Sequence, residues 1–178
     1  MKVLKTDFQD LFIIEPEKHH DSRGFFVELF RLDILQKVVS YDIKFCQDNF
    51  VNSKKNVLRG LHYQENPYAQ SKLVYVSSGK ILDIAVDLRK KSSTYGKVFS
   101  ANISSNNKIA VFIPKGFAHG YVSLCDSTCV HYKVDNYYKK SAEKGVKYDD
   151  PFLNIDWQLS KDEMIISKKD LSLSNYGW

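Results

Sequence analysis

Ile81-Leu82-Asp83-Ile84-Ala85-Val86-Asp87-Leu88 is the stretch of sequence that most directly indicates the fold. Its even-numbered positions are all apolar, whereas two of its odd-numbered positions carry aspartates. Successive side chains of a β-strand point to opposite faces, so this alternation predicts a strand with one buried face and one polar face.

Five further runs have the composition of short strands. They lie at residues 57–63, 72–76, 98–103, 109–113 and 129–134, and glycine or polar turns separate most of them. Helical spacing appears only around Leu32, Leu35, Gln36 and Val39, and after Ser160, where Glu163 has capping-box spacing. Many short strands with little helix predict a mainly β protein. Periodicity alone does not choose among a sandwich, a barrel and a jelly roll.

Length and composition indicate one ordinary globular domain spanning residues 1–178. Hydrophobic residues make up 43% of the chain and charged residues 26%, and no Gly/Ser-rich linker interrupts it. The stretch from Met1 to Asp7 carries charges where a signal peptide needs an apolar run, and no run approaches the ~18 apolar residues of a membrane span. We therefore expect a cytoplasmic protein with no membrane partner.

The formal net charge of +5 bears on the kind of partner. The lysines occur as scattered pairs and form no basic stripe, so a nucleic-acid partner is not expected. A small polyanion such as a nucleotide diphosphate would suit this modest positive excess. The three cysteines, Cys46, Cys125 and Cys129, are an odd set without a CxxC pair, and we expect reduced, packed thiols rather than disulfides or a zinc site.

Two segments hold most of the chemically versatile side chains. In Arg59-Gly60-Leu61-His62-Tyr63-Gln64, strand alternation places His62 on the face opposite Arg59, unless a bulge intervenes. In Ile113-Pro114-Lys115-Gly116-Phe117-Ala118-His119-Gly120, a Pro-x-Gly turn delivers His119 just before another strand. A lone histidine is more often structural than catalytic, so neither segment decides the function by itself.

The second segment resembles the second signature of the cupin superfamily through Pro114-x-Gly116-x-x-His119. The chain as a whole resembles the dTDP-4-dehydrorhamnose 3,5-epimerase family, and far more specifically. The matching segments, in family order, are Asp21 to Glu28, Gln47 to Asn49, Val57 to Gln64, Lys72 to Val74, Asp83 to Arg89, Pro114 to Gly120, Tyr132-Lys133, Tyr137-Tyr138, Glu143 to Gly145, Asp150-Pro151 and Ser167 to Asp170. The chain departs from the family pattern at Leu124 to His131 and after Asp170, where the usual proline-containing close is missing.

The resemblance implies a fold and excludes one kind of chemistry. The fold would be a cupin-type double-stranded β-helix, which is a jelly-roll barrel with a few short helices. Metal-binding cupins present a His-x-His pair in their first signature, whereas Leu61-His62-Tyr63-Gln64 contains a single histidine. His62 and His119 are too few ligands for a divalent ion, which usually needs about three protein donors or more. We expect no metal and no cofactor.

The resemblance also implies roles for individual residues. His62 matches a catalytic base, Asp170 the carboxylate that orients its imidazole, Tyr132 a catalytic acid and Lys72 the cation beside the C4 oxygen of the sugar. The substrate-binding matches are Arg23, Phe25, Glu28, Gln47, Asn49, Arg59, His119, Tyr138, Glu143 and Lys169. Arg23 would reach the site of a neighbouring subunit in a homodimer, and Tyr138 would form an aromatic wall. Strand alternation should point His131 away from the site, so it receives no role.

These roles fit the inversion of carbons beside a ketone. A positioned base can remove a proton next to a ketone when a positive charge meets the enolate oxygen, and inversion needs a second acid across the ring. The expected reaction inverts C5 and then C3 of a nucleotide-diphosphate 4-keto-6-deoxy sugar, converting dTDP-4-dehydro-6-deoxy-D-glucose to dTDP-4-dehydro-L-rhamnose. The alternatives are an epimerase of another nucleotide 4-keto sugar, such as a GDP-linked heptose, a 3,4-ketoisomerase, or a non-catalytic sugar-binding cupin.

Overall fold

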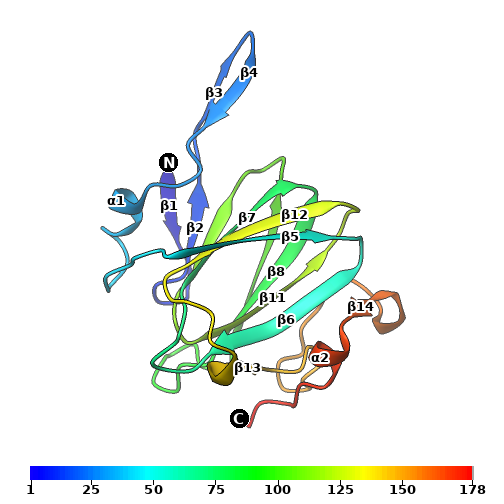
Figure 1. The fold of residues 1–178 in the computed structure, drawn as a ribbon. Coiled ribbons are helices and arrows are strands. Elements are labelled where there is room, and N and C mark those ends of the chain that lie inside the picture. Colours follow the sequence, from blue (N-terminus) through cyan, green and yellow to red (C-terminus); the bar gives the residue numbers. More distant parts are fainter. Residues whose placement is uncertain (178) are drawn as a thin grey trace.

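The computed structural model describes residues 1–177, which form two β-sheets that face each other (Figure 1). The first sheet has the strand order β1 (Lys2–Lys5), β2 (Phe12–Glu15), β10 (Ala110–Ile113), β7 (Lys72–Ser78), β12 (Thr128–Val134), β5 (Gln47–Ser53). The second has the order β13 (Glu143–Gly145), β6 (Val57–Gln64), β11 (Phe117–Ser123), β8 (Lys80–Asp87), β9 (Val98–Ser104), and β14 (Ile165–Ile166) pairs with β6. The prediction of a mainly β, cupin-type jelly roll is confirmed.

The remaining elements are short. Strands β3 (Lys18–Asp21) and β4 (Gly24–Val27) form a hairpin that projects beyond the two sheets (Figure 1). The helices are α1 (Leu32–Leu35), the 3-10 turns η1 (Lys140–Ala142) and η2 (Lys161–Glu163), and α2 (Lys168–Leu171). The capping-box spacing of Ser160 and Glu163 is realised at η2, because the Ser160 backbone N–H donates to the Glu163 carboxylate at 3.1 Å.

All six predicted strands are present, but the sequence pattern missed others. β5 carries polar residues at most positions, because one of its faces borders a polar cavity. β11 is buried at every position, so it has no alternation to detect. The expectation that His119 precedes a strand is therefore wrong, because His119 lies within β11.

β8 is buried on both faces, so the prediction of a half-buried strand is wrong. Ile81 and Ala85 face the space between the sheets, where they belong to a core cluster with Val74 of β7. On the opposite face, residues such as Leu82 pack under the C-terminal segment, which contributes Trp157. This covering layer comes from residues remote in sequence, which local periodicity cannot register.

The outer face of the first sheet is covered in a similar way. Leu35, Val39 and Ile43 pack against Leu73 of β7 and Phe112 of β10. The helical spacing seen in this region produces only one turn of α-helix, because α1 ends at Leu35 and looser turns carry the later apolar side chains.

A β-bulge lies at the centre of β6. His119 pairs with His62 and Tyr121 pairs with Arg59, so three steps along β6 oppose two steps along β11. Gly60 has a φ of 122°, and a Cβ at this position would lie 2.5 Å from Cα of Gly120. The bulge brings Arg59 onto the same cavity as His62, so the exception allowed for a bulge applies and the two residues do not lie on opposite faces.

Replacing Gly60 with alanine should lower the free energy of unfolding by about 3 kcal/mol, because the strained φ and the clash with Gly120 both act against the folded state. Gly24→Ala is the matched control, because Gly24 has a φ of 128° but, apart from its chain neighbours, no atom of the described residues lies within 4 Å of its Cβ position. Its loss should be about 1 to 2 kcal/mol. Urea denaturation measures both, and equal losses would show that close packing at Gly60 is unimportant.

Two further expectations concern the cysteines and the membrane. All three cysteines are free, as expected, but Cys46 is exposed, so the expectation of packed thiols is wrong for that residue. None of the helices in the described part of the chain has the length and apolar character needed to span a membrane.

Candidate active site

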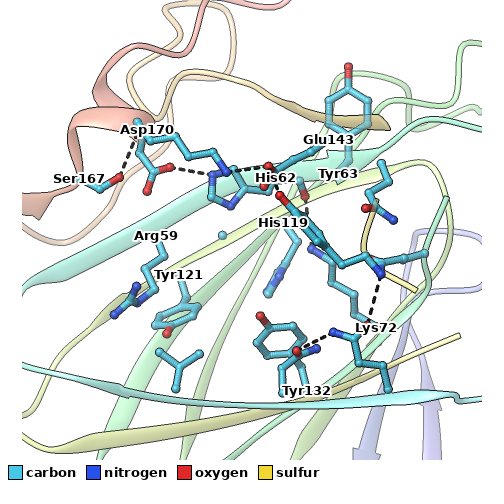
Figure 2. A pocket seen from close by; sticks show the side chains of 18 residues that line it. Arg59, His62, Tyr63, Lys72, His119, Tyr121, Tyr132, Glu143, Ser167 and Asp170 are labelled. Atoms are coloured by element: carbon cyan, nitrogen blue, oxygen red, sulfur yellow. Dashed lines mark hydrogen bonds and ion pairs between the residues drawn. The ribbon is translucent and has the colours of Figure 1, made fainter. Parts of the chain in front are cut away.

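A cavity of about 520 Å³ opens between the two sheets. Figure 2 shows its lining side chains, which come from both sheets and from the C-terminal helix α2. The predicted site residues that line it are His62, Tyr132, Asp170, Lys72, Gln47, Asn49, Arg59, His119, Tyr138, Glu143 and Lys169. Further along the same strands the space between the sheets is filled by apolar side chains such as Val76 and Val130. The cavity is therefore the polar end of the barrel interior.

His62 and Asp170 form a hydrogen-bonded pair at one side of the cavity. His62 Nε2 lies 2.7 Å from Asp170 Oδ1, and the two side chains are 27% and 6% exposed. Burial alone would raise the pKa of Asp170, but the hydrogen bond and the charge of His62 outweigh it, so this pKa lies below its ordinary value. Because an ionised carboxylate can only accept, Nε2 of His62 carries the hydrogen of this bond, and the neutral form of the ring then has its lone pair on Nδ1.

The position of Asp170 depends on the start of α2. The Asp170 backbone N–H donates to the Ser167 side chain at 3.1 Å, which is a helix N-cap. Next to Asp170, Lys169 Nζ lies 2.7 Å from Oε2 of Glu143 on β13. These contacts place the short helix against the end of β6.

A second histidine–carboxylate pair lies deeper in the barrel. His119 Nε2 is 2.7 Å from Asp83 Oδ1, and the two side chains are 7% and 0% exposed. Burial lowers the pKa of His119, against the opposing effect of Asp83. His119 of β11 and His62 of β6 are cross-strand neighbours, so the two imidazoles enter the cavity side by side.

Lys72 enters from the first sheet. Its Nζ donates to the backbone carbonyl of His62 at 3.3 Å. Burial lowers the pKa of Lys72 to about 8, although Asp83 and Glu143 act in the opposite direction. A lysine in this environment is still a cation at neutral pH, and water screens its charge only weakly. Such a charge suits the stabilisation of a developing oxyanion.

Tyr132 of β12 lies across the cavity from His62 (Figure 2). Burial raises the pKa of Tyr132, so its hydroxyl keeps its proton at neutral pH. Beside it, Tyr121 and Arg59 both contact Ser53: the Tyr121 hydroxyl is 3.4 Å from Ser53 Oγ, and Arg59 Nε donates to the same oxygen at 3.3 Å. The His62 imidazole and the protonated Tyr132 phenol thus face one cavity from different sheets.

The rim of the cavity carries Tyr138, Glu143 and Lys169. The Tyr138 hydroxyl donates to Glu143 Oε2 at 2.9 Å. Burial alone would raise the pKa of Glu143, but the hydrogen bonds from Lys169 and Tyr138 hold it below its ordinary value. The rim thus combines an aromatic face with fixed charges of both signs.

Comparison with known proteins places this geometry in a family. A family model described as dTDP-4-dehydrorhamnose 3,5-epimerase matches residues 5–176. The chain belongs to the dTDP-4-dehydrorhamnose 3,5-epimerase family. It is therefore an enzyme of the isomerase class.

Individual relatives agree with this assignment. The dTDP-4-dehydrorhamnose 3,5-epimerase of Shigella flexneri is 44% identical over 172 residues, which are 97% of this chain and 94% of the relative. The crystal structure of the enzyme of that name from Elizabethkingia anophelis superposes with a TM-score of 0.96 at 41% identity, covering 99% of this chain and 96% of that one. The dTDP-6-deoxy-D-glucose-3,5-epimerase of Legionella pneumophila, solved with dTDP-4-keto-L-rhamnose, has a TM-score of 0.92 at 40% identity, with coverages of 98% and 92%.

The family resemblance placed most site residues on one cavity, with three exceptions. Arg23 and Phe25 lie on the projecting hairpin and Glu28 follows it, and none of the three lines the cavity of its own chain. Arg23 is paired with Asp21 at 2.6 Å, and its side chain is 86% exposed. His131 points away from the cavity, as expected, and its ring stacks on Tyr75 with centroids 4.9 Å apart.

Other lining residues were not singled out from the sequence. Gln64, Gln70, Tyr121 and Ser167 all border the cavity. Asp83, the partner of His119, belongs to a segment that matches the family but received no role, although a carboxylate within an otherwise apolar strand is a signal that points to a site. Tyr121 gives no such signal, because a strand tyrosine is ordinary core material.

No group of three or more His, Cys, Asp or Glu residues is arranged to hold a metal ion within residues 1–177. The second histidine of the site faces Asp83 rather than a shared centre with His62.

Proposed function

We propose that this protein inverts C5 and then C3 of dTDP-4-dehydro-6-deoxy-D-glucose, giving dTDP-4-dehydro-L-rhamnose, without a metal or cofactor. The observation that carries the proposal is the placement of the His62–Asp170 pair and Tyr132 on opposite sides of one cavity, with Lys72 between the sheets. Binding alone gives no reason for a base, an acid and a buried cation to converge. Membership of the epimerase family agrees with this chemistry.

Proton removal is the first step. Nδ1 of His62 takes the proton from C5, and the electron pair of the broken C–H bond moves into the enolate whose oxygen is on C4. Asp170 stabilises the imidazolium that forms, through its 2.7 Å contact with Nε2. The Lys72 ammonium meets the enolate oxygen, where charge develops in the transition state.

Reprotonation from the other face completes the inversion. The Tyr132 hydroxyl gives its proton to C5 on the face opposite His62, and the C4 ketone is restored. The same set of groups then acts on C3, which is the other carbon beside the ketone. Proton exchange between His62, Tyr132 and water returns both groups to their starting states.

The rim and the middle of the cavity would hold the nucleotide. Arg59 and Lys169 supply positive charge for a diphosphate, in keeping with the net charge of +5. Tyr138 offers an aromatic face to the base, while Gln47, Asn49, Glu143 and His119 supply hydrogen-bonding groups.

We also propose a homodimer in which Arg23 reaches the partner's site. Phe25 lies on the same β3–β4 hairpin and Glu28 directly follows it. Support comes from the projection of the β3–β4 hairpin and from the exposure of Arg23 (Figure 1). The Phe25 ring is 51% exposed on the same hairpin, which suits burial against a partner.

Mixing two inactive variants tests whether the β3–β4 hairpin contributes Arg23 to the partner's site. Arg23→Ala and His62→Ala proteins should each have little activity, but an equimolar mixture that re-assorts at random should regain about a quarter of normal activity, because about half of its dimers are mixed and each of these has one intact site. In such a dimer, one site combines an intact His62 with an intact Arg23 from the other chain. Activity of the refolded mixture is the measurement, and no recovery would place Arg23 in its own chain's site.

Product analysis tests the reaction itself. The protein is incubated in deuterated water with dTDP-4-dehydro-6-deoxy-D-glucose or with a GDP-linked 4-keto heptose, and NMR locates deuterium and reads configuration. We expect deuterium at C3 and C5 and the L-rhamno product from the first compound. Turnover of the heptose alone identifies a different epimerase, a ketone at C3 identifies a ketoisomerase, and binding without exchange identifies a sugar-binding module. Each of these three outcomes contradicts the proposal.

A further inference from the structure

Tyr138 lies on a rim loop that has no regular structure. This rim loop, residues 135–139, connects β12 to η1. Backbone-to-backbone hydrogen bonds fix its two ends: the Asp135 N–H donates to the Ser71 carbonyl, and the Ala142 N–H donates to the Lys139 carbonyl. The stretch 136–138 between them makes no such bond with any residue of the described range 1–177. Side chains must therefore determine where the Tyr138 ring lies.

Gln64 brackets Tyr138 from both sides. Its side-chain carbonyl accepts the Lys139 backbone N–H at 2.6 Å, and its amide donates to the Tyr137 carbonyl at 3.2 Å. The same amide donates to the Tyr68 carbonyl at 2.7 Å, which joins the rim loop to the turn after β6. Gln64 is 7% exposed, so these bonds are shielded from water.

Two further glutamines hold the neighbouring positions. Gln70 donates to the Asn136 carbonyl at 2.7 Å, and the Gln47 side-chain carbonyl accepts the Tyr138 N–H at 3.2 Å. Gln47 is itself oriented by Asn49, whose side-chain oxygen accepts from its amide at 2.8 Å. Three glutamines from separate segments thus bind four successive residues of the rim loop.

We propose that Gln64, supported by Gln47 and Gln70, is a positioning residue that fixes Tyr138 at the cavity rim and so sets affinity for the nucleotide end of the substrate. This proposal rests on the function proposed above, in which Tyr138 meets the base. Gln64 lies two residues after His62 on β6, so both side chains extend from the same strand toward the cavity. Strand β6 then places the catalytic histidine at the sugar through His62 and positions the rim loop at the nucleotide through Gln64.

The chemistry of glutamine suits this position. A primary amide donates and accepts at once, so it can meet the Lys139 N–H and the Tyr137 carbonyl together. Glutamate would accept from Lys139 but would repel two carbonyl oxygens. Methionine would keep the size and lose all three bonds. Gln64→Met is therefore the informative substitution.

Gln36 provides a matched control far from the cavity lining. Its amide donates to the Tyr41 carbonyl at 2.7 Å and its side-chain oxygen accepts the Ile43 N–H at 2.9 Å, which is the same two-sided use of a glutamine. Gln36→Met removes equivalent bonds without touching the rim loop. Any general loss of stability should appear in both variants.

The experiment compares Gln64→Met, Tyr138→Ala, the double variant and Gln36→Met. Calorimetry measures the Kd of free dTDP, steady-state assays separate KM from kcat, and hydrogen exchange follows the Tyr138 and Lys139 amides without ligand. In Gln64→Met we expect faster exchange at these amides, Kd and KM raised about tenfold, and kcat within about twofold of normal. The double variant should bind dTDP no more weakly than Tyr138→Ala alone.

Three results would overturn the proposal, and the first two concern Gln64 and Tyr138. One is unchanged amide exchange and dTDP affinity in Gln64→Met, and the other is additive loss in the double variant, which would mean that Gln64 acts independently of Tyr138. An equal rise of Kd in Gln36→Met would also overturn it, because the effect would then be a general structural one. Failure of epimerisation with intact dTDP binding would refute the proposed reaction while leaving the role of Gln64 standing.

Discussion

Replacing His62 with alanine should slow exchange of the C5 proton of the keto-sugar into deuterated water by roughly 10²- to 10⁴-fold, the contribution of a positioned general base. His119, which also lines the cavity, cannot substitute because it lies deeper and is engaged with Asp83. The loss should affect kcat far more than KM, since the nucleotide contacts stay in place. NMR of the substrate in deuterated water measures exchange directly.

His131→Ala is the control for this variant. His131 lies beside Tyr132 in sequence but stacks on Tyr75 outside the cavity, so its removal should leave exchange unchanged. Normal exchange by the His62 variant would refute the assignment of the base. Equal losses in both variants would point to general damage instead.

Replacing Lys72 with methionine should lower kcat by roughly 10²- to 10³-fold, the cost of removing one preorganised group from an oxyanion site. The variant should be at least as stable as the native protein, because burial already disfavours the charged form of Lys72. Lys133→Met is the control, since Lys133 lies on the outer face of β12 and pairs with Asp48 at 2.8 Å. Turnover assays and urea denaturation separate a catalytic loss from unfolding.

The pH profile gives a second readout for Lys72. The pKa of Lys72 is lowered to about 8, so the ammonium is present below that pH and is lost as the pH rises through it. Asp83 and Glu143 favour the cation, while His119 faces it from β11. The raised pKa of Tyr132 keeps its hydroxyl protonated over this range. The native kcat should therefore fall above about pH 8, and the residual activity of Lys72→Met should not show that fall.

The fold could be predicted from local pattern only in outline. Alternation and composition located the strands that make up most of both sheets. The sequence could not reveal that β8 is covered on both faces, because Trp157 and its neighbours pack on it from about seventy residues away. Strand β11 was not predicted for a related reason, since burial on both faces removes the alternation that marks a strand.

The site could be predicted only through family resemblance. Asp170 and His62 are 108 residues apart in sequence, and no local rule connects a carboxylate in a one-turn helix to a strand histidine. Strict alternation would place Arg59 and His62 on opposite faces. The bulge that brings them together depends on the close approach of Gly60 to Gly120 of another strand, which local sequence does not reveal. Conversely, Gln64 and Gln70 were passed over because their bonds go to backbone atoms, which leave no mark in the pattern of side chains.

The opposite-face arrangement of His62 and Tyr132 is the centre of this mechanism, and Tyr132→Phe tests it most directly. The ring keeps its place in β12 while the proton that Tyr132 would deliver is gone. The measurement is NMR of dTDP-4-dehydro-6-deoxy-D-glucose in deuterated water, following exchange and inversion at C5 in the same sample. We expect deuterium to enter C5 with retained configuration while inversion falls by roughly 10²-fold or more. Inversion at the native rate, or exchange lost together with inversion, would contradict the mechanism.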